Sequence, residues 1–405
     1  GHATVDAGTN ALAVATSLVG GDLTLRSGHA SGITDLVGAT VTVTGDIYLI
    51  TDDNDGVIDM GSLAVTGSVD LATDGTGAAT VVDATLDLDL AASTVGGALI
   101  ATSTNGGITD TGVLAITGAA TFNAANGKSI TLDSAGTFSD AVDFNAVSGT
   151  LNSVWIDDST ALALQAMTLT GNLTVSAGGN VTNTGKLDIG GSTKVTVSSN
   201  SYLANLNTTT NDFTGAVSIH GAGIVNLTDI NAIEIGQMES TRMILTAGGA
   251  VTQTSSGALA ITQAHGLTIK AWDGSSVYYD ITLNNQSNDL SLLAVTYGAN
   301  VAITDTNAII LGASTVTGTY AVTARGAVTD NGALAITGAA TIIAQSSNGA
   351  TDYAITLDNT SHNFGTIGVK GAAVELVDAG AIDLGASTVS GAYEVTATSG
   401  GDITD

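Results

Sequence analysis

The stretch ITDTGVLAITGAAT at residues 108–121 occurs again, as VTDNGALAITGAAT, at residues 328–341. Eleven of the 14 positions are identical in the two copies. Further copies of this motif begin at Val181, Val251 and Ile403, and the spacing between successive copies is 73, 70, 77 and 75 positions. A fixed period is the sequence signature of a repeat architecture, in which each unit buries its apolar face against its neighbours. The chain therefore carries a superrepeat of about 74 residues.

Short strands are the structural elements that the repeats predict. In GVLAITG at residues 112–118, the large apolar residues Leu114 and Ile116 alternate with small ones, and glycines bound the run. Alternation over a few residues between turn residues is typical of β-strands, whereas helical spacing with caps is not found. Proline, which cannot donate a ladder hydrogen bond, is absent, and the 52 glycines suit many tight turns.

The first hundred residues suggest the length of one coil. Motif starts lie at Ile33, Ile58 and Ile108, a spacing of 25 positions and then of twice 25. We therefore predict an all-β fold, a parallel β-solenoid (β-helix) of about 25 residues per coil, with three coils in each superrepeat. We expect residues 1–405 to form one continuous solenoid, with less regular coils over 1–85 and regular superrepeats over 86–405.

The charge and the cysteine content exclude several classes of function. Eight Lys and Arg stand against 37 Asp and Glu, for a net charge of -29. Such a chain repels nucleic acid and anionic membranes, so we expect neither as a partner. There is no cysteine, which excludes disulfides, thiolate metal sites and cysteine nucleophiles.

Two long segments carry a resemblance to a known class of proteins. They are NAIILGASTVTGTYAVTARGAVTDNGALAITGAATI at residues 307–342 and YAITLDNTSHNFGTIGVKGAAVELVDAGAIDLGAS at residues 353–387. Both resemble the repeats of filamentous-haemagglutinin-like bacterial exoproteins, which are large surface adhesins built of β-strand repeats. The resemblance covers residues 86–405 well and residues 1–85 loosely. It implies a β-helical, exported protein, and it brings no catalytic motif to these repeats.

The stretch TDDNDGVID at residues 51–59 is a candidate calcium site. Asp53, Asp55 and Asp59 lie around Gly56, and carboxylates at alternate positions before a glycine are typical of calcium loops. The EF-hand pattern fails at both ends, because Thr51 and Ser62 occupy the positions of the first and last acidic ligands. The alternative is a solvated turn between coils. Apart from calcium at this site, we expect no cofactor.

Other polar and aromatic residues suggest weaker sites. Asp157 and Asp158 could serve glycoside hydrolysis, which needs two carboxylates, but neighbours on a strand point to opposite faces. The third residue of the motif is Asp at 110 and 330 but Asn or Gln at 183 and 253, so we expect a turn-forming role there, with the side chain bonding the backbone two residues on. A cluster of aromatic residues predicts a contact patch for a sugar or a protein partner: Trp272, Tyr278, Tyr279 and Tyr297.

The function predicted from these features is structural. We expect a non-enzymatic rod or fibre segment of a secreted or surface-exposed bacterial adhesin-like protein, located outside the cell or on its surface. One alternative is a subunit that stacks end to end into an extracellular filament, and another is a β-helix that binds or cleaves polysaccharide. The expected partners are neighbouring copies or further solenoid joined through the coil ends, and host or cell-surface glycans.

Overall fold

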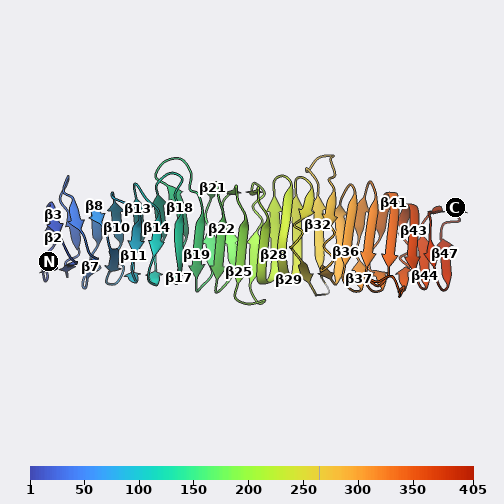
Figure 1. The fold of residues 1–405 in the computed structure, drawn as a ribbon, viewed down its shortest axis with the longest axis horizontal. Helices are drawn as coiled ribbons and strands as arrows, with labels where there is room; N and C mark the ends of the chain where they lie inside the picture. The colour runs from blue at the N-terminus through green and yellow to red at the C-terminus, as the bar shows by residue number, and fades with distance from the viewer. Residues whose placement is uncertain (264) are drawn as a thin grey trace. The chain divides into compact units, whose positions relative to one another are not determined.

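The structure, a computed structural model, describes residues 1–263 and 265–405 (Figure 1). These residues form strands and turns, and none of them forms a helix that could cross a membrane. The chain divides into two compact units, Gly1–Ser198 and Ser199–Asp405. Each unit is a parallel β-solenoid, as the sequence predicted, and each is described by itself. The continuity of one solenoid over the whole chain stays a prediction.

Unit 1 winds through two ladders of parallel strands, here named A and B, and each coil adds one segment to each ladder. Ladder A consists of β1 (Ala3–Asp6), β4 (Leu23–Ser27), β7 (Ile47–Thr51), β9 (Ser68–Ala72), β11 (Leu88–Leu90), β12 (Ser93–Val95), β14 (Ile108–Asp110), β15 (Leu114–Ile116), β17 (Ile130–Phe138), β19 (Val154–Asp158), β22 (Leu173–Ala177) and β25 (Thr193–Val197). Ladder B consists of β2 (Leu12–Val14), β3 (Ser17–Val19), β5 (Ile33–Asp35), β6 (Val41–Val43), β8 (Ile58–Val65), β10 (Ala79–Asp83), β13 (Leu99–Ser103), β16 (Ala120–Ala124), β18 (Val142–Ala146), β20 (Leu162–Leu164), β21 (Met167–Leu169), β23 (Val181–Asn183) and β24 (Leu187–Ile189).

Unit 2 is built in the same way from ladders C and D. Four long strands run through both ladders: β28 (Val217–Asp229), β29 (Ile233–Ala247), β41 (Leu334–Ala344) and β43 (Asn363–Gly371). Ladder C adds β26 (Leu203–Leu206), β32 (Leu267–Ala271), β35 (Leu292–Tyr297), β37 (Ile309–Leu311), β38 (Ser314–Val316), β40 (Val328–Asp330), β42 (Ile355–Leu357), β44 (Val374–Asp378) and β47 (Tyr393–Ala397). Ladder D adds β30 (Val251–Gln253), β31 (Leu259–Ile261), β33 (Ile281–Leu283), β34 (Asp289–Leu290), β36 (Val301–Asp305), β39 (Tyr320–Ala324), β45 (Ile382–Leu384), β46 (Thr388–Val389) and β48 (Ile403–Thr404), while β27 (Asp212–Phe213) precedes β28.

Most coils are shorter than the sequence spacing of Ile33 and Ile58 predicted. These two residues do pair with each other, as expected. Elsewhere in unit 1 the partners are mostly 19 to 24 positions apart, as the register of the other ladder A and B strands shows. The longer spacing belongs to a coil with an enlarged turn before Ile58, where Asn54 and Asp55 adopt positive φ.

The shorter coils change the meaning of the superrepeat. The motif copy at Ile108 lies in ladder A, and three pairing steps lead from it through Ile130 and Val154 to Leu173. The next copy, at Val181, follows half a coil later and lies in ladder B. One superrepeat is therefore three and a half coils, not three, and successive copies lie in opposite ladders.

Unit 2 shows the same half-coil offset. From Val251 in ladder D, three pairing steps lead through Ile281 and Val301 to Tyr320. The next copy begins at Val328 in ladder C, again half a coil further on. Copies of the motif thus occur in both ladders. Either ladder offers a strand one buried side and one exposed side, which an alternating sequence fits.

The interior is a narrow column of aliphatic side chains. The inward positions of the strands are Leu, Ile, Val and Ala with almost no exposed surface, and the alternation of buried and outward residues follows each strand. Larger rings enter at few places, as where Phe122 stacks on Phe144 with ring centroids 5.9 Å apart. Burial of each large aliphatic side chain contributes roughly 1.5–3 kcal/mol, so stacked coils stabilise one another.

Two insertions interrupt the regular coils of unit 2. Residues after β32 form a hairpin in which Trp272 and Tyr278 make an antiparallel bridge, and it stands out from the unit in Figure 1. Gln345 and Asp352 make a second antiparallel bridge after β41. The first insertion lengthens its coil, so that Val251 pairs with Ile281, 30 positions further on.

Candidate functional site

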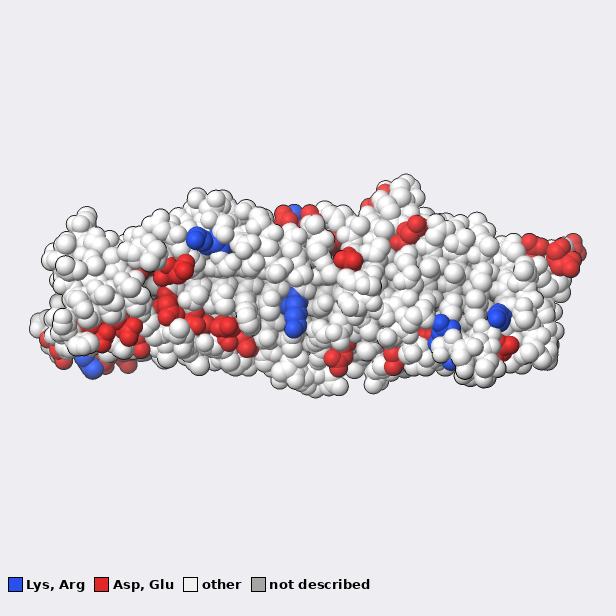
Figure 2. Space-filling model, in the orientation of Figure 1, with Lys and Arg blue, Asp and Glu red and all other residues white. Residues whose placement is uncertain are grey.

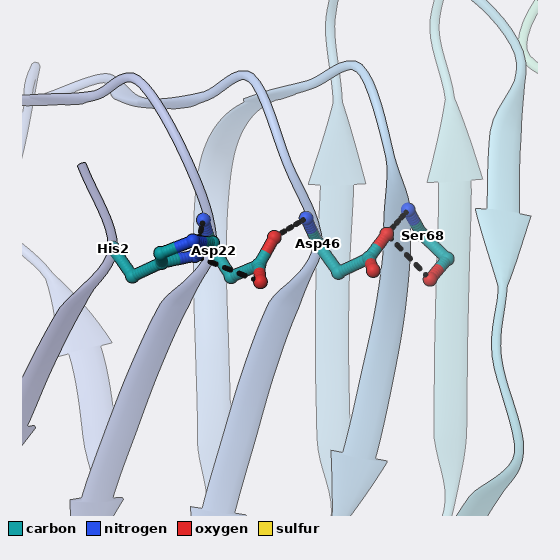
Figure 3. Close-up of polar contacts among 4 residues, drawn as sticks. All are labelled: His2, Asp22, Asp46 and Ser68. Carbon is teal, nitrogen blue, oxygen red and sulfur yellow. Dashed lines mark hydrogen bonds and ion pairs between the residues drawn. The ribbon is translucent and has the colours of Figure 1, made fainter.

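Polar side chains on the turns join each coil to the next, and Figure 3 shows the first such row. The Nδ1 atom of His2 accepts the N–H of Asp22 at 3.0 Å. Asp22 Oδ1 accepts the N–H of Asp46 at 3.1 Å, and Asp46 Oδ1 accepts the N–H of Ser68 at 2.8 Å. The Ser68 hydroxyl also donates to Asp46 Oδ1, at 3.0 Å. Each side chain therefore satisfies a backbone amide of the following coil, which fixes the stacking register.

The same arrangement recurs with neutral side chains. Asn172 Oδ1 accepts the N–H of Ser192 at 2.9 Å and its hydroxyl at 3.1 Å. Asn300 Oδ1 accepts the N–H of Thr319 at 3.0 Å and its hydroxyl at 3.1 Å. Because both Asn and Asp accept these bonds through a side-chain oxygen, the row needs an acceptor oxygen and not a negative charge.

A glycine precedes the receiving residue in these rows, and the geometry requires it. A Cβ on Gly67 would lie 2.5 Å from Asp46 Oδ1, and one on Gly191 would lie 2.4 Å from Asn172 Oδ1. The sequence signal is a glycine, then Ser, Thr, Asp or Asn, then an alternating strand, as in GDIYL, GSVDL and GSTKV. Sequence reasoning treated these as ordinary turn glycines and missed their role.

Carboxylates also gather on the outer surface of unit 1, where Figure 2 shows Asp along the lower edge of the N-terminal coils. The pKa of the Tyr48 hydroxyl is raised, mainly by the negative charge of Asp46. Desolvation and the charges of Asp22 and Asp70 raise it further. Arg26 forms an ion pair with Asp52. Most of this negative surface therefore stays uncompensated.

A second set of aspartates is buried, one in each superrepeat. Each ends a strand and has at most 1% of its surface exposed, and successive members are separated by 75, 71, 76 and 73 positions. We name them the buried aspartate series: Asp83, Asp158, Asp229, Asp305 and Asp378.

Every member of the series holds two backbone amides. One carboxylate oxygen accepts the N–H two residues on, as from Thr85 to Asp83 at 2.7 Å. The carboxylate also accepts an N–H from the preceding coil, as from Val65 to Asp83 at 3.1 Å. The other four members repeat both bonds. The series therefore fastens one turn of each superrepeat to the coil before it.

Burial raises the pKa of two members of this series, Asp305 and Asp158. Desolvation raises the pKa of Asp305 to about 6, against the lowering effect of its bonds from Leu290 and Asn307. Desolvation also raises the pKa of Asp158.

Asp157 lies on the outward side of β19, so the carboxylates of Asp157 and Asp158 point apart, as expected on a strand. The Asp158 carboxylate accepts hydrogen bonds from the backbone amides of Thr160 and Phe138, and these bonds give it a structural role.

At the third position of the motif, Asn183 makes the expected bond to the backbone two residues on, from Nδ2 to the Gly185 carbonyl at 2.8 Å, whereas the aspartates act across coils. Asp110 accepts the amides of Asp133 at 2.9 Å and Ser134 at 3.3 Å, in the next coil. Asp330 accepts the amide of Asp358 at 3.0 Å.

The structure does not bring the calcium candidates together. Asp53 accepts the amide of Asn54, and Asp55 accepts the amide of Thr76 in the next coil. Asp59 lies on β8. Among residues 1–263 and 265–405, no group of three His, Asp or Glu side chains is placed to hold a metal ion.

Three of the four predicted aromatic residues do come together. The ring centroids of Trp272 and Tyr297 are 5.1 Å apart, and those of Tyr278 and Tyr297 are 5.6 Å apart. The Nζ atom of Lys270 lies 4.5 Å from the Trp272 ring centroid, within cation–π range. Tyr279 neighbours the cluster in sequence and donates its amide to Ala271. All four residues are half-buried, so each keeps part of its surface open to solvent.

Comparison with known families supports the repeat architecture. A family model described as repeats of unknown function (DUF5649) matches five successive segments, residues 76–152, 151–220, 222–296, 298–369 and 371–405. The length of the complete segments agrees with the superrepeat read from the sequence. Comparison with curated proteins and with solved structures finds no match to the chain.

Proposed function

From the premise that the chain belongs to this repeat family, we propose that it is a structural, non-enzymatic segment of a secreted or surface-exposed bacterial adhesin-like protein. The observation that carries the proposal is the use of polar side chains. The carboxylates and amides described above bind backbone amides of neighbouring coils, as Asp46, Asn172 and Asp83 do. A catalytic carboxylate would instead face a site where substrate could reach it.

The adhesin-like context rests on the resemblance of residues 307–342 and 353–387 to filamentous-haemagglutinin-like repeats. The negative surface fits a role without nucleic acid, because it repels polyanions. Immunogold labelling of intact, unpermeabilised bacteria that produce the protein tests the location. Gold at the cell surface or in the medium supports the proposal, and label seen only after permeabilisation contradicts it.

Partners through the coil ends form part of the proposal. β47 (Tyr393–Ala397) pairs with β44, and within the described residues no other strand pairs with it. An unpaired strand edge recruits another strand unless it is capped. We expect a strand of another copy to pair with β47 there. Light scattering of the purified chain should show concentration-dependent association, and a strict monomer at high concentration would contradict end-to-end contact.

Glycan contact is a second candidate function, favoured by the aromatic cluster of Trp272, Tyr278 and Tyr297. Aromatic rings with one open face bind the apolar faces of sugars, and the nearby Lys270 would favour an acidic sugar. Binding to a glycan array should fall at least tenfold in Trp272→Ala. The matched control is Trp155→Ala, since Trp155 is 44% exposed but lies elsewhere, on β19. Equal binding by both variants would remove this candidate.

A further inference from the structure

Two successive superrepeats of unit 2 contain the same buried polar site with different chemistry. In one, Gln253 of β30 faces Asn288, and in the next, Asp330 of β40 faces His362. Gln253 and Asp330 are both the third residue of the motif. Asn288 and His362 are both fully buried and close equivalent turns, with amide bonds to Asn285 and Asn359.

The first site is neutral and fully bonded. Asn288 Oδ1 accepts the amide of Leu259 at 3.0 Å and a bond from Gln253 Nε2 at 2.6 Å. Asn288 Nδ2 donates to the carbonyl groups of Leu283 and Thr304 and to Gln253 Oε1. Neither side chain of the pair can take up a proton near neutral pH.

The second site keeps the same acceptor but makes it titratable. His362 Nδ1 accepts the amide of Leu334 at 2.9 Å, as Asn288 accepts that of Leu259. His362 Nε2 lies 3.5 Å from Asp330 Oδ2, and the two side chains are 0% and 2% exposed. Because Nδ1 is the acceptor, the neutral imidazole carries its proton on Nε2, which points to Asp330.

The surroundings of His362 restrain its protonation. The Phe364 ring of β43 packs against the imidazole at a centroid distance of 5.1 Å. The charged groups that face the ring are Asp330 of β40, Asp378 of β44, and Asp358 in the turn after β42. Burial lowers the pKa of His362, and the charge of Asp330 opposes that effect. A second proton would have to enter at Nδ1, where the Leu334 N–H already points.

We propose that the Asp330–His362 pair is an acid-sensitive element of this one superrepeat, in which protonation of Nδ1 breaks the bond from the Leu334 amide and loosens the start of β41. The proton comes from solvent, Nε2 keeps its own, and the Leu334 N–H loses its acceptor. The equivalent Gln253–Asn288 site stays closed, because it has no group to protonate. Acidification would thus open the stack at a defined coil.

Amide hydrogen exchange of the full chain at pH 7 and pH 5 tests the proposal. After correction for the intrinsic rate, exchange at Leu334 should accelerate by about tenfold per pH unit below the unperturbed pKa of His, about 6.5. Exchange at Leu259, held by Asn288 in the same molecule, should not accelerate, since protonation of the neighbouring Asp305 stabilises the fold. Equal acceleration at the two amides would overturn the proposal.

Substitutions distinguish protonation of the Asp330–His362 pair from a general effect of acid on the fold. The double substitution Asp330→Gln with His362→Asn installs the neutral pair of the neighbouring superrepeat, and should abolish the acceleration at Leu334. Persistent acceleration in this variant would also overturn the proposal. If the variant does not fold, the reciprocal pair Gln253→Asp with Asn288→His should transfer acid sensitivity to Leu259, and failure to do so counts equally against it.

Discussion

Replacing Asp83 by alanine removes one member of the buried aspartate series and should weaken unit 1 strongly. Asp83 is 1% exposed and accepts the Val65 amide at 3.1 Å and the Thr85 amide at 2.7 Å, with the Thr85 hydroxyl also at 2.7 Å. Each hydrogen bond to a charged group contributes about 1.5–3 kcal/mol, and the lost bonds leave donors without acceptors. We expect Asp83→Ala to cost about 3–5 kcal/mol and Asp83→Asn, which keeps one acceptor, to cost about 2 kcal/mol.

The assay combines denaturant unfolding with amide exchange at Val65 and Thr85. A loss of about 3 kcal/mol corresponds to roughly 100-fold faster exchange where opening is local. Asp74→Ala is the control, because Asp74 is an exposed turn residue and its removal takes away the same formal charge. If Asp83→Ala and Asp74→Ala shift stability equally, or if exchange at Val65 is unchanged, the structural role assigned to the series is wrong.

Three further outcomes follow from the packing and the buried charge. Asp305 has a pKa of about 6 when folded, above its ordinary value of about 3.8, so the folded state binds the proton more tightly. Stability measured by urea titration should therefore rise as pH falls from about 6 to about 4, and Asp305→Asn should flatten that rise. Gly191→Ala should lower the melting temperature, because its Cβ would lie 2.4 Å from Asn172 Oδ1, whereas Gly61→Ala, with 3.6 Å to the nearest atom, should not. Phe122→Ala should cost about 3–5 kcal/mol in the same urea titrations, since it removes a buried ring packed on two others.

The fold class could be predicted from the sequence because each strand must alternate to bury one side. Leu114 and Ile116 are buried and Ala115 between them is not, as the alternation in GVLAITG required. The superrepeat period could also be read from the sequence, because residues stacked in one column of the solenoid must be of similar size and polarity in each coil. The half-coil offset could not be read in this way. The superrepeat period fits three longer coils as well as three and a half shorter ones, and only the pairing of Ile108 with Ile130 decides between them.

The candidate site was predicted less completely. The buried aspartate series was present in the sequence as Asp at the last strand position in ATVVD, VWIDD and VAITD. Whether that position points inward depends on which residues of the strand face the interior, and the sequence alone does not fix this. The pairing of Asp330 with His362 joins residues 32 positions apart and was invisible without the register. The aromatic cluster was found because its members are close in sequence, and the hairpin after β32 brings them together.

Disulfide trapping of the register tests the central claim most directly, since the chain contains no cysteine of its own. Thr121 and Asp143 are direct partners in ladder B and both point outward, so their Cα atoms lie within disulfide range. The pair Thr121→Cys with Asp143→Cys should oxidise readily. Thr121→Cys with Ala146→Cys, which has the same spacing as Ile33 and Ile58, should not, because Ala146 pairs with Ala124. Efficient cross-linking of the second pair and none of the first would contradict the stacked-coil register described above.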